Sequence, residues 1–127
     1  MQIFGIGIDI VETARIDDSI ERFGDRFLDR VFAPSERAYC DKMKFPARHY
    51  AARFAAKEAI AKSFGTGIGE HLGWADMEIL RSPEGGPHVV LTGDGAEFAA
   101  KNGITEIKIS LSHADDYAAA NAMAICG

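Results

Sequence analysis

The chain has 127 residues, of which 47% are hydrophobic and 26% charged, and its formal net charge is −5 at pH 7. This size and composition are typical of one globular domain, which we expect to span residues 1–127. The negative charge argues against non-specific nucleic-acid binding, and no apolar run is long enough to cross a membrane. The first residues lack the basic segment of a signal peptide, and Cys40 and Cys126 match no metal-ligand spacing. We therefore expect a cytoplasmic protein with reduced thiols.

The first predicted element is a strand from Met1 to Val11, in which the residue character alternates. One face holds Gly5, Gly7 and the carboxylate of Asp9. Glycines inside a strand often mark the close approach of a ligand or of another backbone, and tight packing is the alternative to a ligand site. The opposite face is bulky and apolar, and we expect it to be buried: Phe4, Ile6, Ile8 and Ile10.

A helical period follows from Thr13 to Val31, and Gly24 within it predicts two short helices. Arginines recur along one side of this segment. Such a run, taken alone, is usually a solvated face that pairs with nearby carboxylates. A further short helix is predicted from Pro34 to about Met43. The recurring arginines are Arg15, Arg22, Arg26 and Arg30.

The longest predicted helix runs from about Ala47 to Phe64 and ends at a glycine cap, Gly65. Its alanines favour helix formation and close packing. Helical spacing places Glu58 and Lys62 on one stripe, while Arg53 and Lys57 lie on another stripe. The alanines are Ala51, Ala52, Ala55, Ala56, Ala59 and Ala61.

Glu58 has two interpretations on the sequence alone. It forms an ordinary surface ion pair with Lys62 if nothing else lies near it. If Asp9 on the uncluttered strand face lies beside it, the two carboxylates are suited to Mg²⁺, which takes its other ligands from water and substrate phosphates. The glycines after the helix, Gly65 and Gly67, close a helix instead of opening one, so they form no phosphate-binding loop of the usual kind.

The second half of the chain is mainly strand-like. A hairpin is predicted from Trp74–Arg81 and His88–Leu91, which flank a Pro-Gly-rich turn. A short helix follows from Thr92 to Lys101, and a half-buried strand with Ile107, Ile109 and Leu111 ends near His113. The segment Tyr117–Ile125 is ambiguous, because its alanines favour helix while its position after a strand and a turn favours a returning strand.

Three segments together resemble the holo-[acyl-carrier-protein] synthases, the small bacterial type of 4′-phosphopantetheinyl transferase. They are GIGIDIVETARI (Gly5–Ile16), RFAAKEAIAKSFGTGI (Arg53–Ile68) and SHADDYAAANAMA (Ser112–Ala124). The resemblance covers nearly the whole chain. It implies an α+β fold, in which an antiparallel sheet packs against a long central helix and short helices, and it makes Tyr117–Ile125 a strand.

The resemblance also implies an activity. Members of the family transfer the 4′-phosphopantetheine group of coenzyme A to a serine of an acidic apo acyl carrier protein and release adenosine 3′,5′-bisphosphate. The resemblance implies that Asp9 and Glu58 hold Mg²⁺. Lys62 joins them as a catalytic residue, because diphosphate cleavage requires charge neutralisation and in-line positioning. The base for the carrier serine is left open between Glu58 and a metal-bound water.

Further residues receive expected roles in the same way. Arg15 matches a position that docks the carrier protein, and Arg22 and Arg26 lie on its stripe, so docking is now favoured over a solvated face. The family forms homotrimers with active sites between neighbouring subunits, which the alanine-rich surfaces accommodate. The residues expected to bind coenzyme A are Arg53, Lys57, Lys62, Gly65, Ser112 and His113.

Two other functions remain as alternatives. One is a Mg²⁺-dependent hydrolase of the coenzyme A diphosphate, although such enzymes usually cluster several glutamates on one helix and the long helix has only Glu58. The other is a non-catalytic module that binds coenzyme A or the carrier protein, which would not need the carboxylate pair. Which carrier protein is served is left open.

Overall fold

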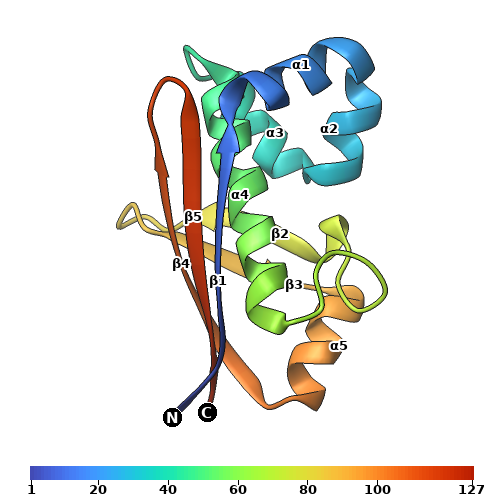
Figure 1. The fold of residues 1–127 in the computed structure, drawn as a ribbon, viewed down its shortest axis with the longest axis vertical. Helices are drawn as coiled ribbons and strands as arrows, with labels where there is room; N and C mark the ends of the chain where they lie inside the picture. Colours follow the sequence, from blue (N-terminus) through green and yellow to red (C-terminus); the bar gives the residue numbers. More distant parts are fainter.

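The computed structural model describes residues 1–127 and has an α+β fold in which every strand pairing is antiparallel. Figure 1 shows α4 running alongside the main sheet, with α1, α2 and α3 gathered at one end and α5 at the other. No helix has the length and apolar character needed to cross a membrane. The elements in chain order are β1 (Gln2–Glu12), α1 (Thr13–Phe23), α2 (Asp25–Val31), α3 (Pro34–Asp41), α4 (Pro46–Phe64), η1 (Trp74–Asp76), β2 (Met77–Arg81), β3 (Pro87–Leu91), α5 (Gly93–Lys101), β4 (Ile104–His113) and β5 (Tyr117–Cys126).

The main sheet has the strand order β1-β5-β4, so that the two edges are formed by β1 and β4. The central strand β5 pairs along its whole length with both neighbours. Its segment Tyr117–Ile125 is therefore a strand, as the resemblance implied and against its helical propensity. The reason is packing, because its alternate alanines are buried facing α4 and their small size lets the helix lie close. These alanines are Ala118, Ala120, Ala122 and Ala124.

Helix α4 is the centre of the core. It packs against β1, β5 and β4 on one side and against α3 and β2 on the other. It ends at Gly65, whose φ of 80° is the left-handed conformation expected of a glycine cap. The predicted break at Gly24 and the predicted hairpin of β2 and β3 are also confirmed.

The prediction for the two faces of β1 is wrong. Ile6, Ile8 and Ile10 are 63%, 69% and 67% exposed, and they form an apolar outer face of the sheet. The face that packs on α4 is the one with Gly5 and Gly7. A Cβ atom would lie 2.0 Å from the carbonyl oxygen of Ser63 at the first glycine, and 1.9 Å from that of Ala59 at the second. Phe4, at a bulge in the register, packs edge-on against the ring of Phe98 instead.

These glycines thus admit the backbone of α4, which was the alternative to a ligand site. We expect Gly7→Ala to destabilise the fold by about 3 kcal/mol, because neither backbone can move aside without loss of contacts in a close-packed core. Chemical denaturation would measure the loss. Gly86→Ala is the matched control, since its only neighbour within 4 Å is the side-chain oxygen of Ser82 at 3.9 Å. Equal stability of the two variants would contradict the close approach.

Candidate functional site

Asp9, Glu58 and Lys62 come together at the edge of β1. Asp9 lies on the strand face toward α4, where its carboxylate Oδ1 accepts a hydrogen bond from Lys62 Nζ at 3.0 Å. The same ammonium donates to the carbonyl oxygen of Ile8 at 2.9 Å. Solvent reaches this group through Lys62, because half of its side chain is exposed. The side chain of Asp9 is largely covered. The helix turn that separates Glu58 from Lys62 puts both on the side that faces β1.

The pKa of Glu58 is raised above its ordinary value, first by burial and then by the negative charge of Asp9, while Lys62 opposes the shift. The two carboxylates are thus close enough for one to disfavour the charge of the other, which is a setting that a cation stabilises. No cluster of three or more His, Cys, Asp or Glu side chains in a metal-binding arrangement exists in the chain. Two carboxylates fit Mg²⁺, because this ion keeps several waters and takes further oxygens from substrate phosphates. The donor set is therefore compatible with the expected metal.

A second group of residues lies at the other edge of the sheet. The rings of His49 at the start of α4 and His113 at the end of β4 are 4.8 Å apart, and Tyr39 of α3 packs edge-on against His49. The guanidinium of Arg53 lies 4.2 Å from the Tyr39 ring centroid. Burial, followed by the positive charges of His113 and Arg53, lowers the pKa of His49 below its ordinary value. The group is therefore an aromatic surface beside the buried cation of Arg53.

Arg53 itself is 3% exposed and its Nε has no hydrogen-bond partner. Its nearest polar contact is weak, a 3.5 Å hydrogen bond from Nη1 to the carbonyl oxygen of His49. Arg53 therefore contributes a buried positive charge close to the rings of Tyr39 and His49.

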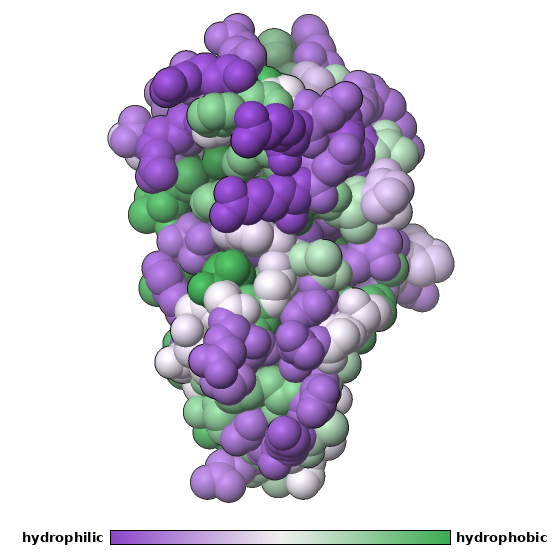
Figure 2. Space-filling model, turned by 90° about the vertical axis from the view of Figure 1, so that its right-hand side faces the viewer, coloured by the Kyte–Doolittle hydropathy of each residue, from purple (hydrophilic) through white to green (hydrophobic).

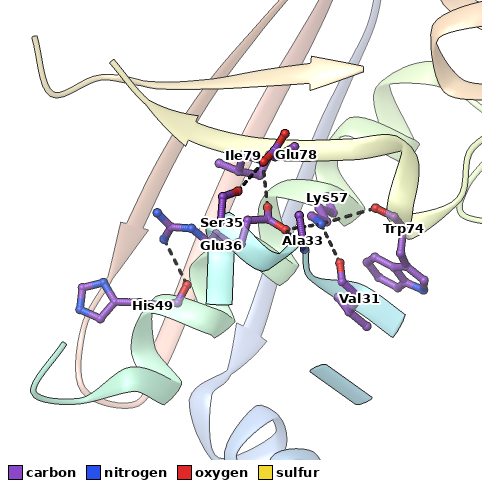
Figure 3. Close-up of polar contacts among 10 residues, drawn as sticks. Val31, Ala33, Ser35, Glu36, His49, Lys57, Trp74, Glu78 and Ile79 are labelled. Atoms are coloured by element: carbon purple, nitrogen blue, oxygen red, sulfur yellow. Dashed lines mark hydrogen bonds and ion pairs between the residues drawn. The ribbon is translucent and has the colours of Figure 1, made fainter. Parts of the chain in front are cut away.

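Lys57 does not lie where the predicted phosphate contact requires. Its ammonium is fully buried and bonds to Glu36 Oε1 at 2.8 Å, and it also donates to the carbonyl oxygens of Val31 at 2.6 Å and Trp74 at 3.4 Å (Figure 3). Burial lowers the pKa of Lys57, while Glu36 opposes that shift. Because no face of this ammonium is open to solvent, Lys57 does not fit its predicted role in binding coenzyme A.

The remaining expected residues are scattered in a single chain. Gly65 is exposed just beyond Lys62, and a Cβ atom added to this glycine would have no neighbouring atom within 4 Å. Ser112 is exposed on the outer face of β4, where it lies beside Ala119, and strand alternation points His113 the opposite way. Glu58 lies nine residues after His49, which corresponds to about 13 Å along the helix, so the two groups lie at different levels of α4.

The arginines of the first helical segment lie outside both groups. Arg15, Arg22 and Arg26 are exposed and take part in no ion pair. Asp25 and Asp29 of α2 pair with Arg37 and not with these arginines. Figure 2, which views the right-hand side of Figure 1, shows hydrophilic side chains over the upper part of the molecule, with apolar patches between them. A groove of about 250 Å³ lies between α1 and α2. It is lined by Ser19, Phe23, Arg26, Phe27 and Arg30.

Two residues of these groups were not predicted as parts of a site. Glu36 was recognisable only as part of a helix start, and the spacing of 21 residues from Lys57 carries no periodic signal. His49 carries no spacing signal that distinguishes it from a surface residue of the helix. Its partner His113 belongs to a distant strand, and only tertiary structure brings the two rings together.

Comparison with known proteins places this arrangement in a family. A sequence model of the 4′-phosphopantetheinyl transferase superfamily matches residues 5–122. The holo-[acyl-carrier-protein] synthase of Desulforudis audaxviator is 49% identical over 123 residues, which cover 97% of this chain and 93% of that protein.

Two solved structures agree with the fold. The crystal structure of holo-[acyl-carrier-protein] synthase from Neisseria meningitidis superposes with a TM-score of 0.91 at 32% identity, covering 98% of this chain and 99% of the other. That of the Helicobacter pylori synthase in complex with coenzyme A gives a TM-score of 0.85 at 35% identity, with 94% and 99% covered. The chain therefore belongs to the 4′-phosphopantetheinyl transferase superfamily, and the relatives it resembles are holo-[acyl-carrier-protein] synthases.

Proposed function

We propose that this protein transfers the 4′-phosphopantetheine group of coenzyme A to a serine of an apo acyl carrier protein. The observation that carries the proposal is the group of Asp9, Glu58 and Lys62 at the open edge of β1. It combines two carboxylates with an exposed cation, as a diphosphate substrate requires. The family and the coenzyme A complex of the Helicobacter pylori relative support the choice of substrate.

In the proposed reaction the carrier serine loses its proton to Glu58 or to a water, its oxygen attacks the phosphorus that bears the pantetheine, and the bond to the adenosine 3′,5′-bisphosphate breaks. Asp9 and Glu58 would hold Mg²⁺, which supplies charge neutralisation for the diphosphate when it is bound. Lys62 leaves Asp9 and places its ammonium on the phosphate oxygens as charge develops on the leaving group. The glycine at position 65 leaves the space beside Lys62 free of side chains, so that the nucleotide can approach the end of α4.

The surface formed by Tyr39, His49 and His113, with Arg53 below it, suits the nucleotide part of coenzyme A, because rings stack on bases and cations attract phosphate. This surface lies at the β4 edge, whereas the carboxylates lie at the β1 edge. One copy of the chain thus has the nucleotide surface at one edge of the sheet and the carboxylate group at the other edge. A site between two copies would bring the β1 edge of one to the β4 edge of the next.

The outer face of the sheet supports a homotrimer. No helix packs on this face, and its isoleucines are more exposed than is usual for a monomer. Across the sheet, Ile6 lies beside Met123 and Ile10 lies beside Ala119, so the apolar surface continues onto β5. A closed ring of three copies would bury these faces against one another and form three sites between subunits.

We expect Ile8→Asp to convert the trimer into folded monomers, because it places a charge in the centre of the apolar face without removing a core contact. Light scattering would give the mass, and the transfer rate should fall with the loss of the shared sites. Val90→Asp on the exposed side of β3 is the control that should stay trimeric. A trimer that survives Ile8→Asp would contradict this interface.

The exposed arginines of α1 and α2 are proposed to dock the carrier protein. An acidic partner would meet Arg15, Arg22 and Arg26, none of which has a carboxylate of its own. The apolar groove beside Arg26 would receive an apolar side chain of the partner. Because the whole protein is negatively charged, this local complementarity has to outweigh the overall repulsion.

Raised salt should therefore increase the KM for the carrier protein by several-fold more than the KM for coenzyme A, because exposed charges are screened more than enclosed ones. Steady-state rates over a series of salt concentrations would test this. In Arg15→Gln/Arg22→Gln the salt dependence of the carrier KM should flatten, whereas Lys101→Gln on α5 should behave as the wild type. Equal salt effects on both substrates would rule out this docking face.

One assay tests the proposed function as a whole. The protein is mixed with coenzyme A, Mg²⁺ and an apo carrier protein, and the carrier is weighed by mass spectrometry. A mass gain of one phosphopantetheine supports the transfer. An unchanged carrier contradicts it: hydrolysed coenzyme A would then identify a hydrolase, and intact but bound coenzyme A would identify a binding module.

A further inference from the structure

Helix α4 carries Glu58, yet its alanines do little to define how the helix is rotated about its axis. Six of its buried side chains are alanines, which are small and alike, beside larger ones such as Tyr50, Ile60 and Phe64. An alanine surface lets a helix turn by several degrees at little cost, because few knobs fit into holes. Something other than the alanines must hold Glu58 toward Asp9.

The buried ammonium of Lys57 makes more hydrogen bonds than any other side chain of α4. It reaches the end of α2 at Val31, the start of η1 at Trp74 and the carboxylate of Glu36 in α3. Three acceptors on three segments fix one position for Nζ. Figure 3 shows these groups converging on Lys57 from different elements.

Glu36 is itself held from several sides. Its Oε1 also accepts from the backbone N–H of Ala33 at 2.7 Å, and its Oε2 accepts from that of Ile79 at 2.8 Å. The pair thus ties α4 to the start of α3 and to β2, and every oxygen of the buried carboxylate has a donor. Such a fully bonded pair gives directional precision that an apolar contact lacks.

Lys57 and Glu58 are consecutive, so their side chains leave the helix about 100° apart. A rotation that moved Lys57 away from its acceptors would swing Glu58 by the same angle relative to Asp9. We propose that Lys57 and Glu36 are positioning residues of the transfer reaction, which set the rotation of α4 and thereby hold Glu58 and Asp9 at the separation that a metal ion requires. This proposal rests on the proposed function for the reaction but makes its own claim about cation binding.

The test is a variant that removes both charges, Glu36→Gln/Lys57→Met, so that no lone charge stays buried. Binding of Mn²⁺, used as a spectroscopic probe for the carboxylate pair, should weaken by about 10–100-fold, which is the usual effect of losing the support of a metal ligand. The kcat at saturating substrates should fall by a similar factor. The KM for the carrier protein should not change, because Arg15 and Arg22 lie on α1 and do not depend on the rotation of α4.

Two further variants keep the result interpretable. Lys57→Arg retains the charge but cannot fit a planar guanidinium among the same acceptors, so it should weaken Mn²⁺ binding too, and it carries the test if the double variant does not fold. Leu72→Ala removes a buried side chain elsewhere and should lower stability without changing Mn²⁺ binding or kcat. Circular dichroism, recorded well below each melting temperature, confirms that the compared proteins are folded.

A folded Lys57 variant with the Mn²⁺ affinity and kcat of the wild type would overturn the positioning role, as would equal losses in Leu72→Ala. Failure of the proposed function looks different. A wild type that binds Mn²⁺ but never modifies a carrier protein contradicts the transfer, while the difference in Mn²⁺ binding between wild type and variant still decides the positioning role.

Discussion

Glu58→Gln and Asp9→Asn each lower the rate of phosphopantetheine transfer by at least about 10³-fold while the protein stays folded, if the carboxylate pair holds the metal. Each change removes one negative charge and keeps the shape of the side chain. The loss falls on the transition state, where charge on the leaving bisphosphate must be neutralised. The rate is measured as the mass gain of the carrier protein with time at saturating coenzyme A.

The thermal stability of Glu58→Gln should not fall with the transfer rate. The charge of Asp9 raises the pKa of Glu58, so Glu58→Gln relieves repulsion, and its melting temperature should not fall. Glu70→Gln, which changes an exposed carboxylate in the loop after α4, is the control that should keep the full rate. A transfer rate within a few-fold of the wild type in Glu58→Gln would contradict the assignment of Glu58 as a metal ligand.

Lys57→Met should destabilise the fold by about 3–5 kcal/mol, because it leaves the carboxylate of Glu36 buried without its cation. For a domain of this size the expected drop in melting temperature is roughly 10–20 °C. Glu36→Gln should cost less if the ammonium retains the two carbonyl oxygens that it also contacts. Denaturant titration gives the free energies of unfolding.

Lys62→Met is the matched control, with the same substitution on the same helix. Its ammonium is half exposed and contacts only Asp9 and the Ile8 carbonyl oxygen, so the stability should change by no more than about 1 kcal/mol. Transfer should nevertheless fall if Lys62 neutralises charge on the substrate phosphates as proposed. The two lysines of one helix are thereby separated into one that supports the fold and one that serves the reaction. Similar stability losses in the two variants would contradict this separation.

Local patterns predicted the elements well, because caps and turns depend on neighbouring residues. The cap at Gly65, the break at Gly24 and the turn between β2 and β3 follow from backbone preferences that operate over a few residues. Residue spacing on α4 also placed Glu58 and Lys62 on one stripe, and the structure has both of them facing β1.

The errors arise where the outcome depends on what packs opposite. Alternation in β1 revealed two faces, but the isoleucine face looked like the core only because apolar residues are usually buried in a single chain. Nor does a lysine on a helix stripe indicate whether it faces a ligand or a carboxylate from a distant helix, as Lys57 does. The strand at Tyr117–Ile125 overrides its helical propensity because two neighbouring strands and α4 hold it in place.

The strand order has a consequence for how the polypeptide reaches its final state. The centre of the sheet is β5, which follows the other helices and strands in sequence, and β1 must wait until residues 117–126 are synthesised before its partner exists, since Gln2 pairs with Cys126. Contacts between such distant segments form slowly. Until then the isoleucines of β1 and the unpaired edges of both outer strands are exposed in the nascent chain, where they are prone to association with other chains. Dependence on chaperones during synthesis should therefore be governed by the interval between the emergence of β1 and that of β5.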